Sequence, residues 1–573
     1  MDASTITAPD LKNQFEADRV LRGMLAHRLP PSRYQDARNV LRDEGSRQQQ
    51  RYASQSHHKQ PYHERSHPKP SPEDAWGQPQ HVTPVPAHWG PSRRAFTQQG
   101  IIHRSQARPD AAHSRLVQMA LVHLLAPEAP GLAPLIATTD VAVHTLMRTG
   151  SAAHLERLVP RLTSRDPDTS ALCDIWGRSH SLSAPDTSMR ATHSEGKWRL
   201  HGRTYARAST CPDAALVLAQ DESETRHLFL LDKPAATSGV HIHAAVPSAM
   251  HPAAPSATLR LDNVSAEHLQ SDVERVGPAP FLQHVWDAVL SVSHMRRVLA
   301  LARGAAETWR VQDEELAYSA LIQETLADMQ ARYESAFNLT YRSVRLLDAT
   351  ENGDESSTPL LQPMALLAKH HAMMQGAEVA RAALQVWGRS ARRTSNGLHA
   401  ALAPVHDRAV AYGTTHDLAL TFLHTLEHQQ QFRELRSDLK ETLTGCSVET
   451  LIGPMKDAVM AFKDANDWLN NARDGGGETL EAGAHRFAVT VGHALSTAFM
   501  IEQADWSLRE DQDGRPAAAV KRFSNMHINH ISNLDPHDAY VLTWDFNCPT
   551  LFECHSGAQS GAPQEALSAV FGS

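Results

Sequence analysis

Residues 411–418 read AYGTTHDL, and this segment lies late in the chain, within a long helical region. From residue 281 onward, apolar side chains recur at three- and four-residue spacing, which is typical of amphipathic helices. Stripes of this kind joined by short connections predict an antiparallel helical bundle. The stripes comprise Val285, Val289, Val292 and Leu299; Ile322, Leu326, Met329, Tyr333 and Phe337; and Leu366, Met373, Ala377, Ala380 and Leu384.

A different texture precedes this bundle, between residues 168 and 265. Short apolar runs alternate there with Gly, Pro, Asp and Ser, which predicts brief strands joined by turns in a compact β unit. The expected strands are residues 197–200, 214–218, 227–231, 240–243 and 259–261.

The first part of the chain is expected to be helical. Residues 17–41 predict two short helices that Pro30 and Pro31 interrupt. Helical spacing returns over residues 114–158. Residues 46–72 are rich in Gln, His, Arg, Ser and Pro and poor in aliphatic side chains, so we expect a loop or a disordered insert there.

The overall composition excludes some classes of function. Among 573 residues, 55 basic and 64 acidic side chains give a net charge of -9. This balance argues against a general electrostatic grip on nucleic acid or on an anionic membrane. Five scattered cysteines without a CxxC pair predict free thiols. No stretch approaches the roughly 20 apolar residues of a membrane span, and the N-terminus lacks the apolar region of a secretory signal. We therefore expect a soluble, intracellular protein, in the cytoplasm.

Five segments follow one another in a characteristic order. They are residues 73–77 (EDAWG) with 88–89 (HW), 161–166 (RLTSRD), 198–205 (WRLHGRTY), 214–220 (AALVLAQ) and 412–415 (YGTT). Together they resemble the acyl-CoA dehydrogenase superfamily, and in particular its AidB-like adaptive-response branch, which includes fungal members. In that family the segments correspond to an entry motif, the lead into the middle domain, two strands beside the flavin and a Glu-Gly-Thr-Thr run.

The resemblance implies an α+β fold that is mainly α. It comprises an N-terminal helical domain (1–167), a small middle β-barrel (168–270), a C-terminal helical bundle (271–440) and a helical extension (441–573). It also implies FAD between barrel and bundle, in a homo-oligomer that is a dimer or a tetramer. The implied reaction is oxidation of an acyl-CoA or a related substrate, in which a carboxylate removes the α-proton while the β-hydride passes to the flavin.

Tyr412 stands where the family has its carboxylate base. A phenol has a reference pKa of about 10, so it could act as a base only beside a cation that favours its ionised form. The alternative is that Tyr412 is a packing residue and the base has been lost. Asp407 and Asp417 are near in sequence and could relocate the base. On a helix, however, Asp417 would lie about 140° around from Tyr412.

Several positions that contact FAD in the family are altered in this chain. Residues 183–184 (SA) replace glycines that bring the backbone close to the flavin. Gln312 and Asp313 replace a Phe-Gly pair beside the pyrophosphate, and a carboxylate repels phosphate there. Arginines at 389 and 392, in the family's glycine-rich loop, either bind phosphate or form a solvated basic loop. The resemblance assigns cofactor contacts to Tyr205, Ala208, Ser209, Arg310, Gly388, Gly413, Thr414 and Thr415.

The 35 histidines raise the question of a metal site. The pairs at 57–58, 370–371, 241 and 243, and 527 and 530 lack HExxH spacing or companion carboxylates. Adjacent histidines on a helix point about 100° apart. We therefore expect core or surface histidines and no metal. Arginines between residues 381 and 436 raise the question of DNA binding, but acidic residues over 502–513 oppose it, and DNA is not an expected partner.

Three functions remain open at this point. The chain is an FAD-dependent oxidoreductase with a degenerate active site, a catalytically inactive AidB-like scaffold or binding protein, or a repurposed flavoenzyme that uses another base. Residues 534–573 are assigned no role.

Overall fold

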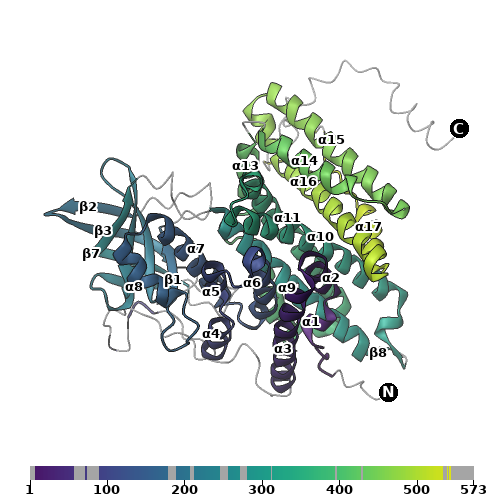
Figure 1. The fold of residues 1–573 in the computed structure, drawn as a ribbon, viewed down its shortest axis with the longest axis horizontal. Helices are drawn as coiled ribbons and strands as arrows, with labels where there is room; N and C mark the ends of the chain where they lie inside the picture. Colours follow the sequence, from purple (N-terminus) through teal and green to yellow (C-terminus); the bar gives the residue numbers. More distant parts are fainter. Residues whose placement is uncertain are drawn as a thin grey trace.

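In the computed structural model the chain folds into three successive parts, which Figure 1 shows. The structure describes residues 7–56, 71–73, 76, 89–177, 189–206, 212–245, 256–271, 280–311, 313–393, 396–426, 430–532, 534, 539 and 541–543. Helices come first, a small barrel of strands follows, and long helices complete the chain. This arrangement is mainly helical and confirms the predicted fold class.

The N-terminal part contains eight helices among the residues described. Pro31 occupies the first position of α3, where its fixed backbone angle suits a helix start, so the predicted break at Pro30 and Pro31 is confirmed. The helices are α1 (Gln14–Ala17), α2 (Arg19–Arg28), α3 (Pro31–Ser56), α4 (Trp89–Gln98), α5 (Ile101–Ala107), α6 (Ser114–Leu125), α7 (Ala133–Thr149) and α8 (Ala152–Leu162).

The predicted loop at residues 46–72 is wrong over its first part. Residues 46–56 continue α3 without interruption. Gln48 is buried and donates a hydrogen bond from its amide to the carbonyl of Leu124 in α6. The polar composition misled the prediction because one face of this helix packs against α6 while the other meets solvent. Residues 57–70 lie outside the described part of the chain.

The middle strands form a small closed barrel. Antiparallel pairs link β2 to β3, β3 to β7, β7 to β5 and β5 to β4. A single parallel pairing, Arg190 with Gln220, joins β4 back to β2 and closes the ring. All five predicted strands are confirmed, whereas β1 and β2 were missed because they are short and carry little alternation. The strands are β1 (Cys173–Trp176), β2 (Arg190–Ser194), β3 (Lys197–Ala206), β4 (Ala214–Gln220), β5 (Arg226–Asp232), β6 (Val240–Ala245) and β7 (Ala257–Ser271).

Long helices make up the rest of the molecule. In Figure 1 the barrel lies at one end and α14 to α17 gather at the other, with α9, α10 and α11 between them. The helix α11 packs along both α9 and α10, and α16 packs against α10, α11, α13 and α15. The helices are α9 (Pro280–Thr308), α10 (Ala320–Glu351), α11 (Thr358–Trp387), α12 (Leu398–Arg408), α13 (Thr415–Thr425), α14 (Gln430–Thr444), α15 (Ile452–Asp474), α16 (Gly477–Trp506) and α17 (Arg515–Ser524).

Two further features bear on the predictions from composition. None of the helices in the described ranges is long and apolar enough to cross a bilayer. Cys173 and Cys446, the cysteines that the structure places, are both free thiols. A two-stranded hairpin follows α9 and is formed by β8 (Arg310–Val311) and β9 (Glu314–Glu315).

Candidate functional site

The loop that carries Tyr412 joins α12 to α13. Tyr412 adopts a left-handed backbone conformation with φ 53°, and Gly413 follows with φ 107°. Positive φ is unusual for a residue with a Cβ atom, so surrounding contacts must hold Tyr412 in place. Its side chain is 8% exposed. Thr414 then caps the N-terminus of α13, and Thr415 is the first helical residue.

Asp417 closes this loop through hydrogen bonds with Thr414. Its carboxylate accepts hydrogen bonds from the Thr414 backbone N–H and hydroxyl, both at 2.8 Å. The Thr414 hydroxyl in turn accepts the Asp417 N–H at 3.2 Å, which completes a capping box. The helical spacing between Tyr412 and Asp417 that the sequence suggested is wrong, because the helix begins only at Thr415.

A fully buried lysine, Lys369, binds the backbone of this loop. The Lys369 ammonium, on α11, donates to the carbonyls of Ala411 at 2.7 Å and Tyr412 at 2.8 Å. It also pairs with the Asp287 carboxylate on α9 at 3.2 Å, and both side chains are 1% exposed or less. An ammonium has three protons to donate. Lys369 therefore directs its charge to the two carbonyls of the loop and to one carboxylate.

Two further charges complete this cluster at the end of α12. The Arg408 guanidinium lies 2.8 Å from Asp407 and 3.4 Å from Asp287, and it is 4% exposed. Burial disfavours the charged guanidinium, but Asp407 and Asp287 more than offset this and raise the pKa of Arg408. Lys369 and Arg408 carry two positive charges, and Asp287 and Asp407 carry two negative ones. The formal charges of the cluster therefore balance, and Tyr412 is among the groups that raise the pKa of Arg408.

Asp287, Lys369 and Arg408 were not singled out in the sequence. The only available signal was a charged side chain inside an apolar helical stripe, as at Lys369 within the run Leu366-Leu367-Ala368. The charge pairs that Lys369 and Arg408 form with Asp287 join helices across 82 and 121 residues of the chain. Spacing within one helix could not reveal those pairs.

The residues predicted near the flavin ring are only partly placed. Tyr205 lies in β3, paired with Thr258 of β7, and is half-buried. Ala208 and Ser209 lie outside the described residues, as do residues 183–184. Their cofactor role stays a prediction.

The two segments predicted to meet the pyrophosphate do lie side by side. Trp309, at the start of the hairpin, packs edge to face against Trp387 with ring centres 5.0 Å apart. Gly388 follows Trp387, has φ 49° and is exposed. Arg310 and Gly388 therefore each come directly after one of the two packed tryptophans in the sequence. The cofactor role of both residues stays a prediction.

The charges of this region fit a pyrophosphate on one side only. Arg310 is committed to Glu315 at 3.5 Å and to the Asp313 carbonyl at 3.4 Å. Its hairpin, residues 310–315, carries one basic and three acidic residues, which repel phosphate. The opposite turn exposes Arg389, Arg392 and Arg393, which attract it. Among the described residues, the arginine turn thus suits a pyrophosphate and the acidic hairpin does not.

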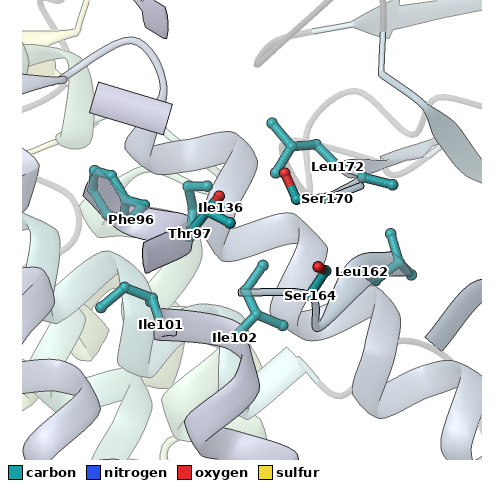
Figure 2. A pocket seen from close by; sticks show the side chains of 10 residues that line it. Phe96, Thr97, Ile101, Ile102, Ile136, Leu162, Ser164, Ser170 and Leu172 are labelled. Carbon is teal, nitrogen blue, oxygen red and sulfur yellow. The ribbon is translucent and has the colours of Figure 1, made fainter. Parts of the chain in front are cut away.

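A small hollow elsewhere is too small to be a substrate site. It lies between the N-terminal helices and the segment that leads into the barrel, as Figure 2 shows. Its free space is about 10 Å³, which is room for about one water molecule. The lining is mostly apolar and includes Phe96, Ile101, Ile102, Ile136, Leu162 and Leu172.

The sequence similarity to known proteins includes the Tyr412 loop and the charged cluster that supports it. The family model described as acyl-CoA dehydrogenase, C-terminal domain, matches residues 287–415, from Asp287 of the buried cluster to the first residue of α13. "Acyl-CoA dehydrogenase family member 11" of Caenorhabditis elegans is 25% identical over 540 residues, which are 88% of this chain and 87% of the relative. The chain is thus similar in sequence to acyl-CoA dehydrogenases, with the family model confined to residues 287–415.

Solved structures of the superfamily share the fold. The crystal structure of Caenorhabditis elegans ACDH-11 in complex with C11-CoA has a TM-score of 0.85 at 21% identity, and the match covers 96% of this chain and 98% of that one. An acyl-CoA dehydrogenase complexed with FAD from Bacillus anthracis has a TM-score of 0.63 at 15% identity, covering 82% and 85%. The acyl-CoA dehydrogenase-like fold therefore extends beyond the segment that the family model matches.

Proposed function

We propose that this chain is a member of the acyl-CoA dehydrogenase superfamily with a degenerate active site: it binds an acyl thioester on the family scaffold and does not carry out dehydrogenation through the family's carboxylate base. The observation that carries the proposal is the Tyr412 loop. A phenol stands at the base position, and the cluster of Asp287, Lys369, Asp407 and Arg408 beneath it has no net charge. Asp407 and Asp417 are both engaged in holding the local structure.

The choice of ligand is supported by the relatives. ACDH-11 was crystallised with C11-CoA, and the two folds match over nearly the whole length of both chains. A thioester site between barrel and bundle would face the Tyr412 loop, which the buried lysine holds in a fixed shape. We extend the proposal to the finer assignments made from sequence: the AidB-like branch of fungal type, the domain limits at 167, 270 and 440, and a dimer or tetramer in the cytoplasm.

A second candidate is a flavoprotein oxidoreductase that uses a different base. The basic turn of Arg389, Arg392 and Arg393 favours it, because three exposed guanidinium groups suit a phosphate of FAD. The residues predicted at the cofactor, from Tyr205 to Thr415, keep that proposed role in this candidate.

Incubation with FAD separates the two candidates. We expect the purified protein, after incubation with excess FAD and gel filtration, to retain little flavin absorbance. Binding of a medium-chain acyl-CoA, followed by calorimetry, is expected without FAD present. Stoichiometric flavin retention would favour the second candidate, and failure to bind any acyl-CoA would remove the first.

Substitution of Tyr412 by phenylalanine tests the base directly. Removing the hydroxyl leaves ring packing intact, so we expect the same acyl-CoA affinity and the same low rate of acyl-CoA-dependent dye reduction in the presence of FAD. A fall in that rate of about 100-fold or more, the range of general-base catalysis, would show that Tyr412 is a base. The control is Tyr318→Phe, because Tyr318 is 70% exposed and distant in sequence from the loop.

A further inference from the structure

Seven histidines gather where α11 meets α16, and they account for part of the unusual histidine content. We call them the histidine arrays, because they form two rows that begin at neighbouring residues of α11. The first row is His370, His485 and His416, and the second is His371, His493, His530 and His527.

The first row runs from the interior toward the Tyr412 loop. His370 Nε2 lies 3.4 Å from His485 Nδ1 on α16, and the two rings are 5.3 Å apart. The His485 ring is 5.2 Å from that of His416, which is exposed in the first turn of α13. The row thus connects three helices through imidazoles alone.

The second row runs from α11 to the opposite surface. His371 Nε2 lies 3.1 Å from the Ser335 hydroxyl of α10, and its ring is 5.3 Å from that of His493 on α16. Gln375 approaches His493 at 3.1 Å. Further rings continue outward at 5.2 Å each, from His493 to His530 and on to exposed His527. Adjacent histidines on α11 therefore serve separate rows, as their angular separation on a helix requires.

These rows lie among groups that disfavour positive charge. Burial, with a smaller effect of neighbouring imidazoles, lowers the pKa of both His370 and His493 to about 3. Burial likewise holds the pKa of His371 far below its usual value, with His493, His370 and Arg332 adding to the effect.

The groups that face the arrays come from every helix packed around them. From α10 the facing charge is Arg332, and from α16 it is Arg486. The helices α14 and α15 meet α16 nearby through the rings of Phe432 and Trp468, and α17 contributes Phe523. Within the described residues, the charges that act most strongly on the buried imidazoles are thus all positive. Among the residues that the structure describes, no carboxylate forms an ion pair with His370, His371 or His493 of the kind that joins His123 to Asp18.

We propose that the contact between α11 and α16 is an acid-sensitive latch, closed while the histidine arrays are neutral and opened when they take up protons. Histidines released into solvent have a pKa of about 6.5, whereas the buried ones stay unprotonated. Below that pH, the open form gains protons that the closed form cannot hold. Each buried histidine then favours opening by about tenfold per pH unit. With His370, His371 and His493 acting together, the ratio of open to closed changes by up to about 1,000-fold per pH unit.

Hydrogen exchange of the full-length protein tests the latch. Protection factors, corrected for intrinsic exchange, are compared at about pH 7 and about pH 5, between which a solvent-exposed histidine changes charge. We expect amides of α11 around residues 370–371 and of α16 around 485–493 to lose at least about tenfold in protection at the lower pH. Amides of α6 are expected to keep theirs. Equal protection at both pH values, or parallel loss in α6, would overturn the proposal.

Substitutions identify the responsible groups. His370→Gln combined with His371→Gln, and separately His493→Gln, replaces titrating rings with neutral amides, and each is expected to reduce the pH response. Two independent variants are used so that one that fails to fold leaves the other informative. The matched control is His424→Gln. Like His416, His424 is exposed on α13, but it lies outside the arrays. A control that responds as the array variants do would also exclude the latch.

Discussion

Replacement of Asp140 by alanine is expected to lower the free energy of unfolding by about 3–5 kcal/mol, because it breaks a fully buried ion pair. Asp140, on α7, and Arg115, on α6, are both 0% exposed and lie 2.5 Å apart. The same carboxylate accepts the Trp286 indole N–H of α9 at 2.8 Å. Removing it leaves a buried guanidinium and a buried indole N–H without this acceptor. Denaturant unfolding followed by circular dichroism measures the loss.

Two controls separate this loss from ordinary surface effects. Asp262→Ala removes a partner of Arg260 from a pair that is more than half exposed, where a change of about 0–1 kcal/mol is expected. Arg115→Met combined with Asp140→Leu removes both charges and is expected to recover much of the stability. Arg115 also pairs with Glu351 at 2.7 Å. In the double variant Glu351 loses this partner and keeps its ion pair with Arg108. A loss below about 1 kcal/mol for Asp140→Ala would show that this buried pair contributes no more to the free energy of unfolding than an exposed pair does.

The elements that followed from local periodicity were predictable. The apolar stripes fell on α9, α10 and α11, and five apolar runs became β3 to β7, because side chains repeat every 3.6 residues in a helix and every two in a strand. The end of α3 was not predictable from composition. Residues 46–56 are polar, yet α6 covers one face of the helix and Gln48 finds a backbone acceptor there.

The candidate site itself stays a prediction, and the sequence did not reveal the charged cluster that supports its loop. The Gly-Thr-Thr run placed the Tyr412 loop, and Arg310 and Gly388 lie on either side of one Trp–Trp contact. Lys369 and Asp287 escaped notice because their pairing joins helices 82 residues apart. Among the described residues no group of three or more His, Cys, Asp or Glu side chains could hold a metal ion, and the absence of a metal site stays a prediction. What spacing could not reveal was that the rings of His370 and His371 would each meet another histidine from α16.

Replacement of Lys369 by methionine is the other change with a large expected effect, about 3–5 kcal/mol, because Asp287 then stays buried with a diminished set of partners. Asp287 keeps Arg408 at 3.4 Å and the Gln283 amide at 3.2 Å, and it loses the ammonium. The cluster then carries a net negative charge. The carbonyls of Ala411 and Tyr412 lose their donor as well, at about 1 kcal/mol for each hydrogen bond.

The same substitution tests whether the loop shapes the thioester site. Because Tyr412 holds a positive φ only while its surroundings enforce it, loss of Lys369 is expected to loosen the loop and weaken acyl-CoA binding by about tenfold, or 1.4 kcal/mol. Lys456→Met, an exposed lysine on α15, is expected to change stability by less than about 0.5 kcal/mol. Adding Asp287→Asn to Lys369→Met restores charge balance and should regain stability. It does not restore the donor to the loop carbonyls, so binding should stay weak. If stability and acyl-CoA affinity recovered together, charge balance alone would set the shape of the site, and the hydrogen bonds from Lys369 to the loop carbonyls would not.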